Sequence, residues 1–171
     1  MAVTETRSTT RKTKTPARAA APDAIKLLKD DHRQVEAWFD EFESTNSGSK
    51  KNKLATQICL ALRVHTQIEE EILYPACREA GIEEDMMDEA DVEHDGAKKL
   101  IAEIEAGSAG DDHWDAKVKV LGEMIKHHVK EEEQRGGMFA KAKQADLDLN
   151  ELGAEMKARK DELMKQSKRR N

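Results

Sequence analysis

Residues 54–72 read LATQICLALRVHTQIEEEI, and this segment carries the clearest structural signal in the chain. Its apolar side chains recur at steps of three and four, which is the spacing of one face of an α-helix. That face consists of Leu54, Ile58, Leu62, His65, Glu69 and Ile72. A histidine and a carboxylate therefore occupy consecutive turns of a helix face that is otherwise apolar and expected to be buried.

Three further segments have the same helical period, and each also carries a histidine on its apolar face. The three faces are Ile25, Leu28, His32, Val35, Phe39 and Phe42; Met87, Ala90, His94, Ala97, Ile101 and Ile104; and Trp114, Val118, Leu121, Ile125, His128 and Glu132. Helix-breaking residues separate the four segments at 46–49, around Pro75 and Gly81, at 107–110 and at 136–137. Short connections between amphipathic helices predict antiparallel neighbours, and hence an up-down four-helix bundle.

Composition supports an all-α fold and excludes several classes of protein. Hydrophobic and charged residues each make up 37% of the 171 residues, while aromatic residues make up 4%. β-Branched and aromatic residues, which strands favour, are therefore too scarce for an all-β fold. No apolar run approaches the roughly 18 residues of a membrane span. We also find no nucleophile–base set and no glycine-rich phosphate loop, so hydrolase and nucleotide-binding functions lack support.

The chain divides into three regions. Residues 1–21 are basic and nearly free of large apolar side chains, so they are predicted to form a disordered tail. Residues 22–143 form the bundle. Residues 144–171 are predicted to form an additional C-terminal helix with a basic end, packed outside the bundle through Leu149, Leu152, Met156 and Leu163.

Partners and location follow from charge and cysteine content. The net charge of -6 and the solvated basic ends favour no specific nucleic acid partner, and no membrane partner is expected. Two cysteines, Cys59 and Cys77, cannot form a disulfide scaffold, and no secretory leader opens the chain. These features predict a cytoplasmic protein.

The buried histidines are the main functional signal. One histidine on an apolar face is usually a hydrogen-bonded core residue. Here four of the chain's six histidines lie on the inner faces of four different helices, together with two glutamates. Burying so many polar groups without partners would cost several kcal/mol, and a metal centre would remove that cost. The predicted metal ligands are His32, His65, Glu69, His94, His128 and Glu132.

Their order along the chain predicts a paired-metal site. Each helical hairpin supplies a single histidine followed by a His-x-x-x-Glu pair, and residues four apart share one helix face. Four imidazoles with two carboxylates suit iron, manganese or zinc better than calcium or magnesium. The Glu-x-x-His pattern of ferritin-like sites is absent, because Lys29, Leu62 and Ile125 stand three residues before His32, His65 and His128.

These residues resemble the hemerythrin-like, or HHE cation-binding, domains. The resemblance covers roughly residues 22–143. It is carried by Asp31-His32-Arg33, residues 65–71 before Tyr74-Pro75, Glu93-His94-Asp95, and residues 127–133 before Met138-Phe139. It implies a non-haem centre of two iron ions with an exogenous bridge, in which Glu69 and Glu132 bridge and the four histidines are terminal ligands. Manganese or zinc is the less favoured occupant.

The sequence departs from the oxygen-carrying members of that family. Those proteins have a second histidine four residues from the first on the third helix, whereas Ala90 and Lys98 stand at these positions here. One iron would therefore lack an imidazole, and either Glu93 or His127 completes it or the position stays open to a small ligand. The bridging acid of the fourth helix can also lie five residues after the histidine, which leaves Glu133 as an alternative to Glu132.

The function that these features predict is a di-iron protein that binds or reacts with oxygen, nitric oxide or peroxide. Its roles would lie in sensing, iron handling or oxidative-stress defence, and weak peroxidase-like or catalase-like activity is left open. Two alternatives remain: an iron-responsive interaction module without turnover, and a purely structural bundle with buried histidines.

Overall fold

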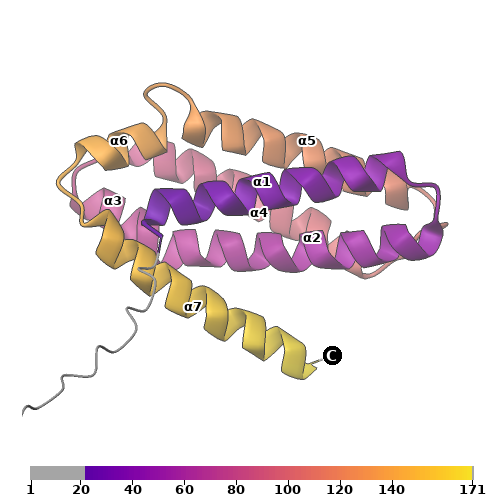
Figure 1. Cartoon of the computed structure of the whole chain (residues 1–171). Coiled ribbons are helices and arrows are strands. Elements are labelled where there is room, and N and C mark those ends of the chain that lie inside the picture. Colours follow the sequence, from indigo (N-terminus) through magenta and orange to yellow (C-terminus); the bar gives the residue numbers. More distant parts are fainter. Residues whose placement is uncertain (1–21, 171) are drawn as a thin grey trace, which may run out of the picture.

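The computed structural model describes residues 22–170, and all regular secondary structure in this range is helical. The helices that form the bundle are α1 (Ala24–Ser44), α2 (Gly48–Ile68), α4 (Glu84–Glu105) and α5 (Trp114–Glu133). Figure 1 shows them packed as an antiparallel bundle in which α1 pairs with α2 and α4 pairs with α5. The predicted up-down four-helix bundle is therefore confirmed. The tail predicted for residues 1–21 lies outside the described residues.

Side-chain caps explain where the first two helices begin. The Asp23 carboxylate accepts a hydrogen bond from the backbone N–H of Lys26 at 2.8 Å, and α1 starts at Ala24, directly after Asp23. Ser47 caps α2 in the same way by accepting from the N–H of Lys50. These caps satisfy N–H groups that have no partner within a helix.

The second bundle helix contains a π-helical turn, Glu69–Leu73, and continues as α3 (Tyr74–Glu79). Pro75 has no N–H to donate, and the preceding Tyr74 N–H donates to the Glu69 carbonyl five residues back. In a regular α-helix, nine residues make about two and a half turns, so Tyr74 would face away from His65. The wider π turn instead brings Tyr74 to the inner face, where it is fully buried.

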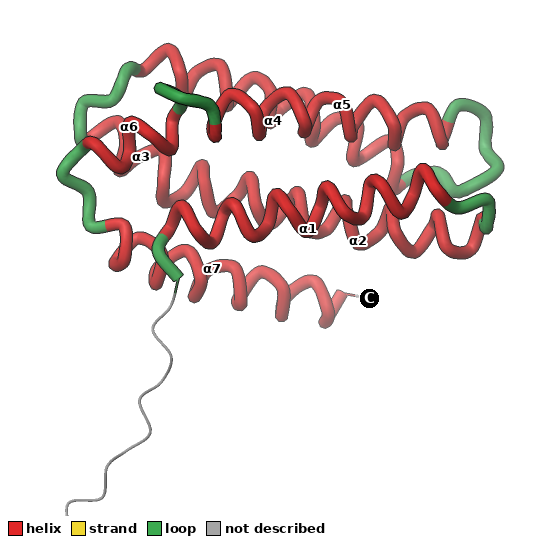
Figure 2. The backbone as a smooth tube through the Cα atoms, turned by 45° about the horizontal axis from the view of Figure 1, so that its top comes forward, coloured by secondary structure: helices red, strands yellow, loops and turns green. Residues whose placement is uncertain are grey.

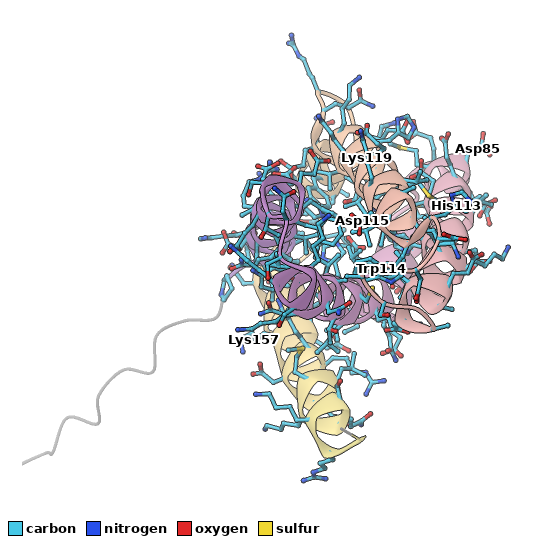
Figure 3. The ribbon with its side chains drawn as sticks, turned by 90° about the vertical axis from the view of Figure 1, so that its right-hand side faces the viewer. Asp85, His113, Trp114, Asp115, Lys119 and Lys157 are labelled. Atoms are coloured by element: carbon cyan, nitrogen blue, oxygen red, sulfur yellow. The ribbon has the colours of Figure 1, made fainter. Side chains whose placement is uncertain are left out.

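Two apolar clusters fill the bundle. One lies towards the end that carries α3 and α6 (Met138–Gln144), and it includes Leu28, Leu73 and Phe139. The other includes Ile58, Leu121 and Trp114, and Trp114 donates its indole N–H to the Ile104 carbonyl at 2.9 Å. Figure 3 views the molecule from the end where Trp114 begins α5.

The last helix, α7 (Leu149–Arg170), lies outside the bundle against α1 and α2, as Figures 1 and 2 show. Met156 is fully buried, and Leu149, Leu152 and Leu163 pack around it in the first apolar cluster. This confirms the additional C-terminal helix. Across residues 22–170, none of the helices combines the length and apolar character needed to cross a membrane.

Candidate metal centre

The six predicted ligands come together in the middle of the bundle. His32 comes from α1, His94 from α4, the pair His65 and Glu69 from the second bundle helix, and the pair His128 and Glu132 from α5. All six are buried, with no residue more than 5% exposed. Their faces meet because each lies on the apolar stripe of its helix, as the sequence pattern predicts.

The histidines form two pairs, one from each helical hairpin. The Nε2 atoms of His32 and His65 are 3.1 Å apart, and those of His94 and His128 are 3.2 Å apart. Both pairs have ring centroids 4.8 Å apart and tilted planes. The two hairpins thus present equivalent pairs of ring nitrogens to a common centre.

The two glutamates lie between the histidine pairs. Glu69 places Oε2 3.2 Å from Nε2 of His65 and 3.5 Å from Nε2 of His94. Glu132 reaches Nε2 of His32 at 3.4 Å and Nε2 of His128 at 3.6 Å. Each carboxylate therefore approaches one histidine of each pair, as a bridging ligand would.

The donor atoms fall into two overlapping groups, each compact enough to hold an ion. The groups are His32, His65, Glu69 and Glu132, and Glu69, His94 and His128. Within each group the ligand atoms lie within 4.8 Å of one another. Both carboxylates are buried, and neither has a hydrogen-bond partner among the described residues. Buried polar groups of this kind nearly always have a partner, so these four oxygens fit a cation between them.

An outer carboxylate faces the Nδ1 atom of every histidine in the centre. Nδ1 of His32 lies 2.8 Å from Glu133, that of His94 lies 2.9 Å from Glu70, and that of His128 lies 2.8 Å from Glu93. The fourth contact is longer and is an ion-pair contact rather than a hydrogen bond: Asp31 lies 3.5 Å from Nδ1 of His65, a nitrogen that has no hydrogen-bond partner among the described residues. Such partners hold a ring so that its other nitrogen faces the metal, and they raise its basicity as a ligand.

These outer contacts follow a rule that repeats in the two hairpins. The acid before each single histidine, Asp31 or Glu93, faces the histidine of the adjacent helix in the same hairpin. The acid after each central glutamate, Glu70 or Glu133, faces a histidine of the other hairpin. In the sequence these outer acids appear as a repeated acid-His pair and a repeated His-x-x-x-Glu-Glu motif. The motifs alone do not reveal which histidine each acid contacts.

The geometry separates the alternatives that the sequence left open. Glu132 lies in the centre, whereas Glu133 faces Nδ1 of His32 and contacts Lys29 at 3.2 Å. Glu93 is directed to Nδ1 of His128, and His127 is 60% exposed and lies 3.2 Å from Glu131. Neither Glu93 nor His127 therefore takes the place of the missing imidazole.

Tyr74 reaches the centre instead. Its hydroxyl oxygen lies 3.3 Å from Nε2 of His94, and its ring stacks on that imidazole with centroids 5.6 Å apart. In the other histidine pair, Phe139 of α6 stacks on His32 with ring centroids 5.8 Å apart. The two aromatic rings occupy corresponding places, but only Tyr74 of these two adds an oxygen that could act as a further ligand.

Burial and neighbouring charges shift the pKa values of the histidines in the centre in opposite directions. Burial lowers the pKa of His32 to about 4, aided by the charge of His65. Burial also opposes the charging of His65 and His128, but the carboxylates around them outweigh it and raise their pKa values to about 10 and about 9. Burial beside Glu69 raises the pKa of Glu132. The metal-free centre therefore holds protons that a cation would displace.

A small cavity lies beside the four imidazoles on the side of the second apolar cluster. Its volume is about 20 Å³, and its walls include Val35, Leu62, Ile125 and Val129 as well as the histidines. In this measure a water molecule needs about 10–15 Å³. A second cavity of about 100 Å³ reaches His128 and Glu132 between Met86, Glu89 and Met138.

Comparisons with known proteins agree with this fold. The chain is 22% identical in sequence to a hemerythrin HHE cation-binding domain-containing protein from Mycobacterium kansasii, a solved structure with a TM-score of 0.69. That match covers 83% of this chain and 87% of the other, and it shows the same fold.

A curated relative, a DNA nickase from Nostoc sp., is 31% identical over 107 residues. The match covers 63% of this chain but 30% of the nickase, so the chain corresponds to a minor part of that protein. The model of the hemerythrin HHE cation-binding domain matches residues 23–142. With this match over most of its length, and with buried histidines and glutamates grouped so that they could hold a cation, the chain belongs to the hemerythrin HHE cation-binding domain family.

Proposed function

We propose that the centre binds two iron ions. The observation that carries this proposal is the arrangement of four inward-facing imidazole nitrogens around two buried carboxylates without hydrogen-bond partners among the described residues. A mixed imidazole and carboxylate donor set suits iron, and the overlap of the two ligand groups at Glu69 suits two adjacent ions. Glu69 and Glu132 would bridge, and the histidines would ligate from either side.

The ligand of this centre is a small molecule, namely oxygen, nitric oxide or peroxide. The cavity beside the imidazoles is sized for one water or a molecule of similar size, and apolar side chains line it. Iron supplies the redox chemistry when it is bound. The apolar walls keep bulk water out, the outer carboxylates orient the rings, and Tyr74 places a hydroxyl beside His94.

The favoured role is sensing, iron handling or oxidative-stress defence. Transport of oxygen is less favoured, because the place of the missing imidazole is taken by neither Glu93 nor His127. The nickase activity of the Nostoc relative carries little weight here, since the shared segment covers 30% of that protein. An iron-responsive module without turnover is the second candidate, and the contacts of α7 described below favour it.

The test is anaerobic reconstitution of the full chain with ferrous iron, followed by elemental analysis and absorption spectroscopy. We expect about two irons per chain and a spectral change on adding oxygen, nitric oxide or peroxide. A matched variant, Glu69→Gln, should lose most of the iron because it removes the carboxylate shared by both ligand groups. A chain that takes up no iron, or one zinc ion in its place, would rule out the proposed centre.

A further inference from the structure

The C-terminal helix α7 contacts acidic residues close to the candidate metal ligands, although it lies beyond the matched family region of residues 23–142. Met156 is fully buried in the first apolar cluster. Gly153 lies so close to the start of α1 that an added Cβ would stand 2.3 Å from the Pro22 carbonyl oxygen. The first half of α7 is therefore tightly seated on α1.

A charged side chain of α7 is linked to His65 through Asp31. The Lys160 ammonium contacts Oδ1 of Asp31 in α1. The other carboxylate oxygen of Asp31 lies 3.5 Å from Nδ1 of His65. Asp31 thus lies between the Lys160 ammonium and the ring of His65. Because the Asp31 side chain is only 19% exposed, solvent screens the Lys160–Asp31 ion pair less than it would a pair on the surface.

The other outer carboxylates are held from within the bundle. Lys29 and Arg33 of α1 contact Glu133, and Lys98 of α4 contacts Glu70. Glu93 lies 3.5 Å from His127 of α5. Among the described residues, Asp31 is the one member of this set that is paired with α7.

A second contact joins α7 to the same half of the centre. Arg159 donates to Glu71 at 2.7 Å, in the π turn two residues after Glu69. The helix therefore contacts Asp31, which faces His65, and Glu71, which lies two residues after Glu69 in the same π turn.

We propose that Lys160 is a positioning residue that couples the docking of α7 to metal binding at the His32–His65 pair. Docked α7 holds Asp31 against His65, which keeps Nε2 of that ring directed at the ions. Coupling of this kind is reciprocal, so bound metal stabilises the docked position of α7 by the same factor. The inference rests on the proposed metal centre. It makes α7 the element outside the bundle whose docking changes when metal binds.

If Lys160 positions Asp31, removing its side chain should change metal affinity in one direction. If Lys160 acts only through its positive charge, the change should have the opposite sign. A cation near bound metal ions repels them, so loss of its charge alone would strengthen metal binding. Loss of a positioning contact would weaken metal binding, because His65 would no longer be held in one orientation. The sign of the change therefore separates the two explanations.

The first experiment compares the affinity for cobalt(II), used alone as the probe, in full-length chains that carry single substitutions. Outer partners of ligand histidines are each worth about 10–100-fold in metal affinity. Lys160 acts one contact further from the metal, so Lys160→Met should weaken cobalt binding by roughly 3–10-fold. Lys160→Arg keeps the positive charge and should retain most of the wild-type affinity. Lys157→Met is the control, because Lys157, labelled in Figure 3, pairs with Asp161 on its own helix.

A double-mutant cycle with Asp31→Asn tests the route of the effect. If Lys160 acts through Asp31, Lys160→Met should add little to the loss that Asp31→Asn causes by itself. Independent, additive losses would overturn the proposed route. Gly153→Val provides a second variant, because it should displace α7 while leaving Lys160 and Asp31 intact, and it should weaken cobalt binding to a similar extent.

The reciprocal experiment measures amide hydrogen exchange in α7 with and without cobalt. Exchange in residues 149–170 should slow in the loaded wild-type chain, and this protection should shrink in Lys160→Met. Equal exchange in both states, or unchanged or tighter cobalt binding by Lys160→Met, would overturn the inference. If the wild-type chain binds no metal, the proposed metal centre fails, whereas if wild type and Lys160→Met bind two ions equally, this inference alone fails.

Discussion

The two halves of the metal centre have the same inner ligands but different surroundings. Each half contains two histidines from one hairpin, at nearly equal Nε2 separations, and shares the two glutamates. Beside the His94–His128 pair stands the hydroxyl of Tyr74, whereas the His32–His65 pair faces the apolar ring of Phe139. The repeat in the sequence thus produces equivalent inner ligands without producing equivalent sites.

Different backbone routes explain why the aromatic residues differ. Tyr74 reaches the inner face along a continuous helix because the π turn brings it round to the side of Glu69. In the other hairpin, α5 ends at Glu133 and a turn follows that contains Gly136, whose φ of 84° is in the left-handed region that favours glycine. Phe139 then approaches His32 from α6. A small change of backbone geometry after each His-x-x-x-Glu motif therefore decides which chemical group lies beside the histidines of each half.

The largest effect should come from the residues that join the halves. Glu69→Gln removes a carboxylate that approaches one histidine of each pair, so both ions should be lost rather than one. Iron or cobalt content by elemental analysis should fall from about two per chain to nearly none. Retention of one tightly bound ion would show that Glu69 belongs to a single half.

Removing one histidine from either half should have a smaller effect. His94→Ala leaves His32, His65 and both glutamates, and His32→Ala leaves His94, His128 and both glutamates. Each variant is expected to retain about one ion per chain. Equilibrium dialysis followed by metal analysis would measure this, and complete loss in one variant alone would show that the halves are filled in an obligatory order.

The two halves should respond alike to pH. Each has one histidine with a lowered and one with a raised pKa, and the raised values are about 10 for His65 and about 9 for His128. Between pH 6.5 and 9 the folded, metal-free protein retains protons that the unfolded chain releases, so its stability should fall as pH rises. Each retained proton changes the unfolding free energy by about 1.4 kcal/mol per pH unit.

Metal binding should show the opposite trend with pH. The same protons must leave before the ligands can bind a cation, so metal affinity should increase from pH 6.5 to 9. Thermal melts of the metal-free and cobalt-loaded chain across this range would check both trends. A metal-free melting temperature that rises over the same interval would contradict the raised pKa values that we assign to His65 and His128.

The smallest effect should come from Tyr74→Phe, which makes the two halves more alike. The chain should keep both ions, because the four histidines and two glutamates remain. Tyr74 is the one tyrosine in the sequence, so any phenolate-to-iron absorption band must come from it. We expect that band in the ferric wild-type protein and its loss in the variant; a wild-type spectrum without it would place the hydroxyl outside the ligand set.

Much of the inner centre could be predicted because helical periodicity is local. His65 and Glu69, like His128 and Glu132, share a face in any α-helix, and the apolar residues around them show which face is buried. Burial of all six candidates follows from the same pattern. The outer carboxylates were harder to predict, because the partner of Glu70 or Glu133 depends on which hairpin lies opposite.

Tyr74 could not be assigned from periodicity for a physical reason. A regular helix would turn it away from His65, and a turn with one extra residue reverses that result. Pro75 signals an interruption of the helix, but it does not reveal how the chain continues. Periodicity is therefore a poor guide immediately after the His-x-x-x-Glu motif, where one residue changes the facing side.

The sequence by itself determined four amphipathic helices, their antiparallel order and the six residues on their inner faces. These properties depend on spacings of a few residues and on short connections, which neighbouring side chains specify. The tertiary structure decided that Tyr74 stacks on His94 and Phe139 on His32, and that Lys160 reaches Asp31 across 129 positions of sequence. Such contacts depend on how whole helices pack, because side chains so far apart in the chain meet only after the helices have docked.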